Sequence, residues 1–161
     1  NNFGMNGDWV EYFFACNENY FEENTHGLNI REQIPSFVKW LQHAEIIDEN
    51  KKTTQLGEVL MNLYIDMPDL VWQIIWINLS YKSPIAKWYK ENVKWGTEFT
   101  FNDIEELVKT DYPDVSPKTV HNIVYALFTV CILIPIISAI CLTEGRESPS
   151  RYWEVAIPKI I

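Results

Sequence analysis

The chain has 161 residues, of which 47% are hydrophobic and 14% aromatic, and this composition argues against a disordered protein. Its net charge of −9 opposes electrostatic attraction to nucleic acid over the surface as a whole. The three cysteines, Cys16, Cys131 and Cys141, are an odd number without a close pair, which favours a reducing cytoplasm over a disulfide scaffold.

The start of the chain shows no signal peptide. The sequence begins Asn1, Asn2, Phe3, without an initiating methionine or a signal peptide, and we expect it to be a fragment of a longer protein. The most apolar run, residues 130–142, is interrupted by Pro135 and falls short of the roughly 20 residues that span a bilayer. A buried strand or helix end is expected there, and no membrane association.

Residues 1–67 are predicted to form aromatic N-terminal helices and a first lobe. Asp8 is expected to cap a helix rich in aromatic residues, and a second aromatic piece follows at about residues 18–24. These rings either complete the core of this chain or contact a domain that precedes it.

A winged-helix pattern follows in this lobe. Ser36 is expected to begin a helix, Ile46 and Ile47 a short strand, and the polar cluster 48–52 a turn. Thr53 and Thr54 return as the paired strand before the next helix. This order resembles the end of many winged-helix domains.

Residues 68–98 are predicted to form a central buried helix and a helix striped with lysine. The stretch DLVWQIIWINLSY after Pro68 is apolar nearly all round, which is typical of a helix at the centre of a fold. Ser83 and Pro84 begin the next helix, where Lys87, Lys90 and Lys94 recur at helical spacing. The lysines form either a phosphate-facing patch or, as we favour, a solvated face.

Residues 99–161 are predicted to form a helix–turn–helix with a second wing. Thr100 and Asp103 have the spacing of a helix N-terminus, and the run YPD breaks that helix. Ser116 and Pro117 then begin a second helix with an apolar stripe. The second wing is expected within residues 142–157.

Candidate contacts to nucleic acid or to a partner protein lie on two helices. They are the polar residues of the second helix of the motif and the lysines above: Ser116, Lys118, Thr119, His121, Asn122, Lys87, Lys90 and Lys94. Residues 99–130, however, hold five acids and only two lysines, whereas a duplex binder needs several cations on phosphates. A motif used for packing or protein interaction is therefore favoured over DNA binding.

The predicted fold is mainly α with small β-hairpins: two winged-helix-like lobes packed around a central hydrophobic helix. The sequence contains no glycine-rich phosphate loop, Gly-x-Ser-x-Gly elbow or His-Glu-x-x-His motif. We therefore expect neither catalytic residues nor a metal or other cofactor in this chain. A stand-alone enzyme is the third alternative, after an interaction module and a DNA-binding module.

Four stretches carry a family resemblance: WVEYFF, FVKWLQHAEIIDENKKTTQLGEVL, WINLSYKSPIAKWYKENV and SPKTVHNIVYAL. In this order, over about residues 3–128, they resemble the C-terminal accessory region of phosphoadenosine phosphosulfate (PAPS) reductase family proteins from anaerobic bacteria. The resemblance implies a non-catalytic accessory or interaction domain, whose partner is an N-terminal catalytic domain of the same polypeptide or another protein. The family's Ser-Gly-Gly-x-Asp-Ser type loop is absent here, so no functional residue is carried over.

Overall fold

The computed structural model describes residues 4–21, 27–94 and 99–133, and in these ranges the protein is mainly helical and contains no β-strand. The helices are α1 (Gly7–Cys16), η1 (a 3-10 helix, Asn17–Phe21), α2 (Gln33–His43), α3 (Gln55–Tyr64), α4 (Pro68–Lys82), α5 (Pro84–Asn92), α6 (Phe101–Asp111) and α7 (Pro117–Ile132). Over the same ranges, no helix combines the length and the apolar character that crossing a bilayer requires.

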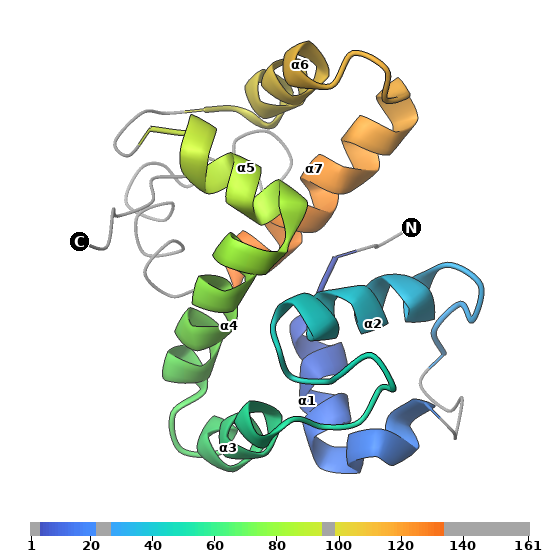
Figure 1. The fold of residues 1–161 in the computed structure, drawn as a ribbon, viewed down its shortest axis with the longest axis vertical. Helices are drawn as coiled ribbons and strands as arrows, with labels where there is room; N and C mark the ends of the chain where they lie inside the picture. The colour runs from blue at the N-terminus through green and yellow to red at the C-terminus, as the bar shows by residue number, and fades with distance from the viewer. Residues whose placement is uncertain (1–3, 22–26, 95–98, 134–161) are drawn as a thin grey trace, which may run out of the picture.

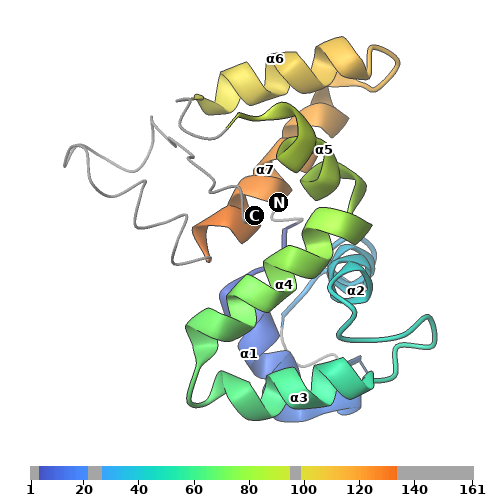
Figure 2. The ribbon, with the colours of Figure 1, turned by 60° about the vertical axis from the view of Figure 1, so that its left-hand side comes forward.

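Helix α4 links the two ends of the molecule. Helix α3 lies at its N-terminal end and α5 and α6 at its C-terminal end, whereas α2 lies alongside it and the residues just after α2 meet Asn78 and Lys82 (Figures 1 and 2). It packs directly against α2, α3 and α5. Its buried face carries five apolar side chains, Val71, Trp72, Ile75, Trp76 and Leu79. These side chains belong to one hydrophobic cluster to which every α-helix contributes.

The expectation that α4 is buried on every side is wrong. Leu70 and Ile77 lie opposite its buried face, and their side chains are 41% and 43% exposed. Since the stretch is apolar nearly all round, its own pattern selects no face for burial. The buried face is therefore chosen by the neighbouring helices, which leave the opposite one open.

The aromatic residues of the N-terminal segment pack into the core of this chain. Phe13 is fully buried, and its ring lies 5.9 Å from that of Tyr20 and 6.4 Å from that of Phe37 in α2. Phe14 meets Tyr64 of α3 at 5.2 Å. Burial raises the pKa of the Tyr20 hydroxyl to about 12. Of the two roles predicted for these rings, the structure shows core packing.

The first helix begins slightly differently from the prediction. The side chain of Asn6, and not that of Asp8, accepts a hydrogen bond from a free amide of the first turn, the N–H of Asp8, at 3.0 Å. Similarly, α2 begins at Gln33, three residues before the Ser36 that the sequence suggested. Both shifts concern only the first turn of a helix, where several polar residues compete for the same free amides.

The predicted first hairpin is not confirmed, because the loop between α2 and α3 contains one isolated antiparallel bridge, between Ile47 and Thr53. The Asp48 side chain accepts hydrogen bonds from the amides of Asn50 and Lys52 at 2.8 and 2.9 Å, which closes a tight turn. Immediately after the bridge, Thr54 caps α3 by accepting from the Gly57 amide at 2.9 Å. The chain thus enters a helix before a ladder of strands can extend.

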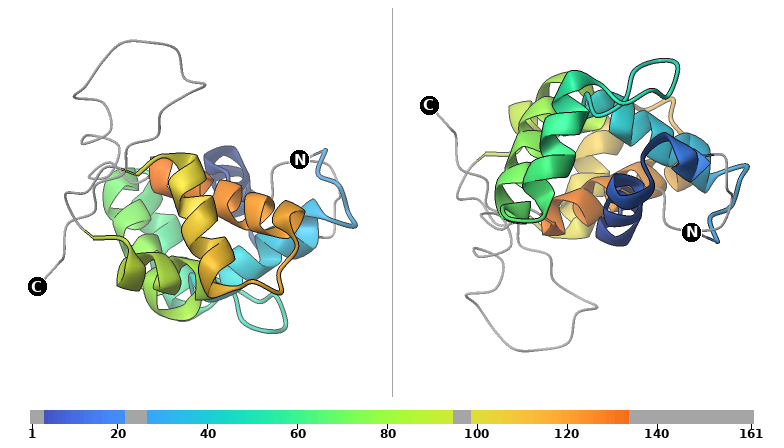
Figure 3. Two further views of the ribbon diagram at one scale, coloured as in Figure 1. Left: turned by 90° about the horizontal axis from the view of Figure 1, so that it is seen from above. Right: turned by 90° about the horizontal axis from the view of Figure 1, so that it is seen from below.

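Helices α6 and α7 are two neighbouring helices at the positions predicted for the motif, and they lie side by side when the molecule is seen from above (Figure 3). The predicted N-caps are confirmed: Thr100 and Asp103 make a reciprocal capping box, and Ser116 accepts from the Thr119 amide. Helix α6 ends at Asp111, before the YPD break. The second wing predicted at residues 142–157 lies outside the described residues.

Gly57 gives the first lobe a testable packing constraint. A Cβ atom at this buried position would collide with the carbonyl oxygen of Ile46 and the Thr53 methyl group. We expect Gly57→Ala to lower the free energy of unfolding by about 1–3 kcal/mol, despite alanine's better helix propensity. Urea-induced unfolding measures this.

Gly7→Ala is the matched control, because its Cβ would meet only a flexible Leu133 methyl group at 3.2 Å. This variant should stay within about 0.5 kcal/mol of the wild type. Equal stability of the two variants would contradict the close approach of α3 to the Ile46 backbone.

Candidate functional site

The candidate site is the exposed side of α7 near its N-terminus, where five of the predicted contact residues lie. Lys118 is exposed on the first turn. The Ser116 hydroxyl accepts from the Thr119 amide at 3.2 Å and lies 2.8 Å from the Thr119 hydroxyl. Ser116 and Thr119 therefore use part of their hydrogen-bonding capacity to cap the helix.

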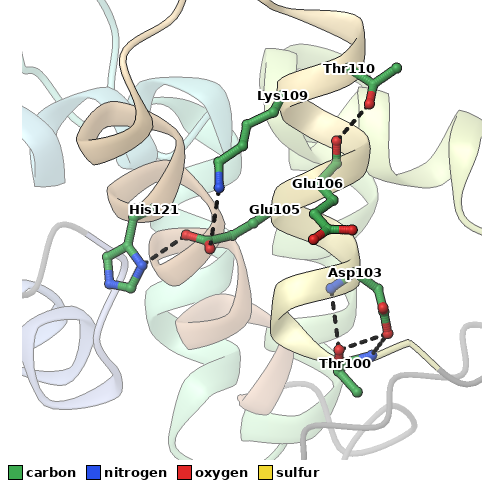
Figure 4. Close-up of polar contacts among 7 residues, drawn as sticks. All are labelled: Thr100, Asp103, Glu105, Glu106, Lys109, Thr110 and His121. Carbon is green, nitrogen blue, oxygen red and sulfur yellow. Dashed lines mark hydrogen bonds and ion pairs between the residues drawn. The ribbon is translucent and has the colours of Figure 1, made fainter.

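His121 is tied to the neighbouring helix of the motif. Its Nδ1 atom lies 2.8 Å from Oε1 of Glu105, and Nζ of Lys109 lies 3.8 Å from the other carboxylate oxygen (Figure 4). The ring of Phe101 meets the imidazole edge-on at 5.2 Å. The Glu105 side chain is only 14% exposed, whereas that of His121 is 58% exposed. The imidazole is therefore exposed to solvent, and its Nδ1 side contacts the largely buried carboxylate of Glu105.

The start of α6 is fixed by a second polar cluster. The Thr100 hydroxyl and amide both donate to Oδ2 of Asp103 at 2.7 Å, and these bonds lower the pKa of the Asp103 carboxyl (Figure 4). The Asp103 amide donates back to the Thr100 hydroxyl at 3.2 Å. A negative carboxylate is therefore held at the N-terminus of α6.

Thr119 and Asn122 face a small open pocket of about 290 Å³ between three helices. Its other walls include Ser36 and Trp40 of α2 and Ile85 of α5. Asn122 is only partly exposed as a result. The Asn122 side chain, which could in principle read a base edge, thus lines a pocket that it shares with α2. Residues of the first lobe therefore lie beside this side of α7.

The three lysines of the second candidate patch do not form one stripe. Helix α5 ends at Asn92 and Val93 is extended, so Lys94 is not on the helix as the sequence predicted. Lys90 places its ammonium 3.8 Å from the centre of the Tyr81 ring, a cation–π contact. Lys87 is exposed on α5. The Ser83 side chain is buried at the start of α5 and makes no capping hydrogen bond.

The first lobe also carries a larger groove, which the sequence did not predict. An open groove of about 790 Å³ lies between α2, the loop after it and the start of α3, with Lys39, His43, Glu45, Asp48 and Thr54 among its walls. Burial, and then the charge of Lys39, lowers the pKa of His43. The four-residue spacing of Lys39 and His43 places both on one face of a helix and could have signalled the groove.

In the part of the chain that the structure describes, no three His, Cys, Asp or Glu side chains lie close enough together to hold a metal ion. The walls of the larger groove carry both basic and acidic side chains. Comparison with known proteins assigns no family. No family model matches the chain, and neither a curated protein nor a solved structure matches it.

The contact between α6 and α7 can be measured with a double-mutant cycle. We expect Glu105→Gln and His121→Ala to show a coupling energy of about 0.5–1 kcal/mol in unfolding experiments at neutral pH, because the histidine is largely exposed. Glu106→Gln with His121→Ala is the control cycle, since the imidazole contacts Glu105 and Glu106 points away from it (Figure 4), and it should show almost no coupling. Equal couplings would contradict a specific pair.

Proposed function

We propose that this chain is a non-catalytic interaction module of a larger PAPS-reductase-like protein. The observation that carries the proposal is the composition of the exposed face of α7: Lys118, His121 and Tyr125, with the imidazole bonded to the Glu105 carboxylate. Exposed tyrosine is enriched at surfaces that bind proteins, compared with the rest of a protein's surface. A carboxylate beneath this face opposes the approach of phosphate groups.

The parent protein is proposed from the resemblance of residues 3–128 to the region that follows the reductase domain. The partner would then be the catalytic domain of the same polypeptide, or a second protein, and sulfur or nucleotide metabolism would be the parent's activity. The proposed compartment is the cytoplasm, where thiols such as Cys16 and Cys131 stay reduced.

The finer architecture that we propose is a pair of winged-helix-like lobes. The bridge between Ile47 and Thr53, between α2 and α3, supports the first lobe. The capped pair α6 and α7 supports the second. The same geometry makes a DNA-binding module the alternative function, and exposed Lys118 on the first turn of α7 favours it.

Duplex DNA separates the two functions. We expect a fluorescence-anisotropy titration with random duplex at low salt to show no binding tighter than about 10⁻⁶ M. The reason is that the Glu105 carboxylate beneath the exposed face of α7 repels phosphate groups. Tighter binding that weakens steeply with salt would overturn the interaction proposal. In that event, Lys118→Ala should reduce the salt slope by about 1.

The parent assignment has its own test in the complete open reading frame. An upstream domain with a Ser-Gly-Gly-x-Asp-Ser type loop would support it, and an upstream region without a nucleotide-binding loop would remove it. If the domain is present, we expect calorimetric titration of the two parts to show binding that Tyr125→Ala weakens at least about tenfold. Tyr12→Ala is the control, since Tyr12 is similarly exposed but lies on α1 at the other end of the molecule.

A further inference from the structure

One face of α4 is apolar and open to solvent. Leu70, Ile77 and Tyr81 are 41%, 43% and 68% exposed, and Ile74 between them is partly buried. Their spacing of four, three and four residues places all four on one side of the helix, opposite the buried face. From Leu70 to Tyr81 this stripe is about 16 Å long. We call these four residues the α4 stripe.

Two further apolar side chains are exposed in the turn before α4. Ile65 and Met67 are 85% and 52% exposed there, next to the exposed carboxylates of Asp66 and Asp69. At the other end, Lys90 covers one side of the Tyr81 ring. Exposed apolar side chains that gather on one side of a helix, unlike scattered single ones, mark a candidate binding surface.

The C-terminal 28 residues of the same chain have the composition to fill this surface. Residues 134–142 hold four isoleucines and a leucine, and residues 151–161 add Tyr152, Trp153 and further aliphatic residues. An apolar segment of this length needs a surface on which to be buried, because leaving it in water is unfavourable.

The place where α7 ends puts this segment within reach. Leu133, just after α7, packs against the core, and the C-terminal end of α7 lies beside α4 (Figures 1 and 2). Nine residues span up to about 30 Å when extended, which exceeds the length of the α4 stripe. A tether this short gives the segment a millimolar effective concentration, so it competes well against a second copy of the chain.

The segment carries three basic and three acidic residues, so its side-chain charges cancel and the match to the α4 stripe lies in its apolar residues. We infer that residues 134–161 dock on the α4 stripe of their own chain and cover its apolar side chains. The interface is intramolecular and does not depend on the function proposed above.

Limited trypsin digestion of the full chain tests this docking, because Arg146 and Arg151 are cleavage sites within the segment. We expect slow cleavage at both in the wild type, and at least about tenfold faster cleavage in Ile77→Asp, whose carboxylate cannot be buried on the α4 stripe. Intact-mass spectrometry follows the products. Leu70→Asn is the milder second variant, and it should accelerate cleavage in the same direction.

Ile30→Asp is the matched control, since Ile30 is 59% exposed and lies outside α4, and its cleavage should match the wild type. Unchanged circular dichroism of each variant shows that the helices persist. Wild-type rates in both Ile77→Asp and Leu70→Asn would overturn the docking. So would a dimer in sedimentation experiments that Ile77→Asp dissociates, because the α4 stripe would then hold a second copy.

Discussion

The burial of one face of α4 holds this protein together. Trp72, Ile75 and Leu79 lie on that face, and each large apolar side chain buried there contributes roughly 1.5–3 kcal/mol. A directional contact fixes the helix against the first lobe: the Asn78 amide donates to the Ala44 carbonyl at 2.9 Å. Since α4 packs against α2 and α3 of the first lobe and against α5, which precedes α6 and α7, the placement of these last two helices depends on this packing.

In the pair α6 and α7, the shape and the charge favour different functions. The caps and the break of α6 and α7 are those that the sequence predicted for the motif, yet His121 contacts the Glu105 carboxylate and Asn122 lines a pocket shared with α2. Affinity for a duplex comes chiefly from cations placed on phosphates. A surface of mixed charge with an exposed tyrosine is better suited to a protein partner, which is why an interaction module is the proposed function.

Local signals in the sequence predicted the helices well and the hairpins poorly. The caps at Thr100 and Ser116 were predictable because they depend on residues three apart along the chain. The strand pair predicted at 46–54 is reduced to one bridge, since Thr54, the residue after the bridge at Thr53, already caps α3. Similarly, Lys94 fits a helical spacing but follows Val93, where the backbone is already extended.

By itself, the sequence determined where the helices of the motif begin and end and that α4 is an apolar element of the core. Only the tertiary structure decided which residues meet, because contacts such as Trp88 Nε1 to Asp111 Oδ2, at 2.6 Å, join positions 23 residues apart. It also decided which side of α4 is buried. A helix that is apolar nearly all round gives no preference of its own, so the neighbouring helices select the buried face and leave the α4 stripe open.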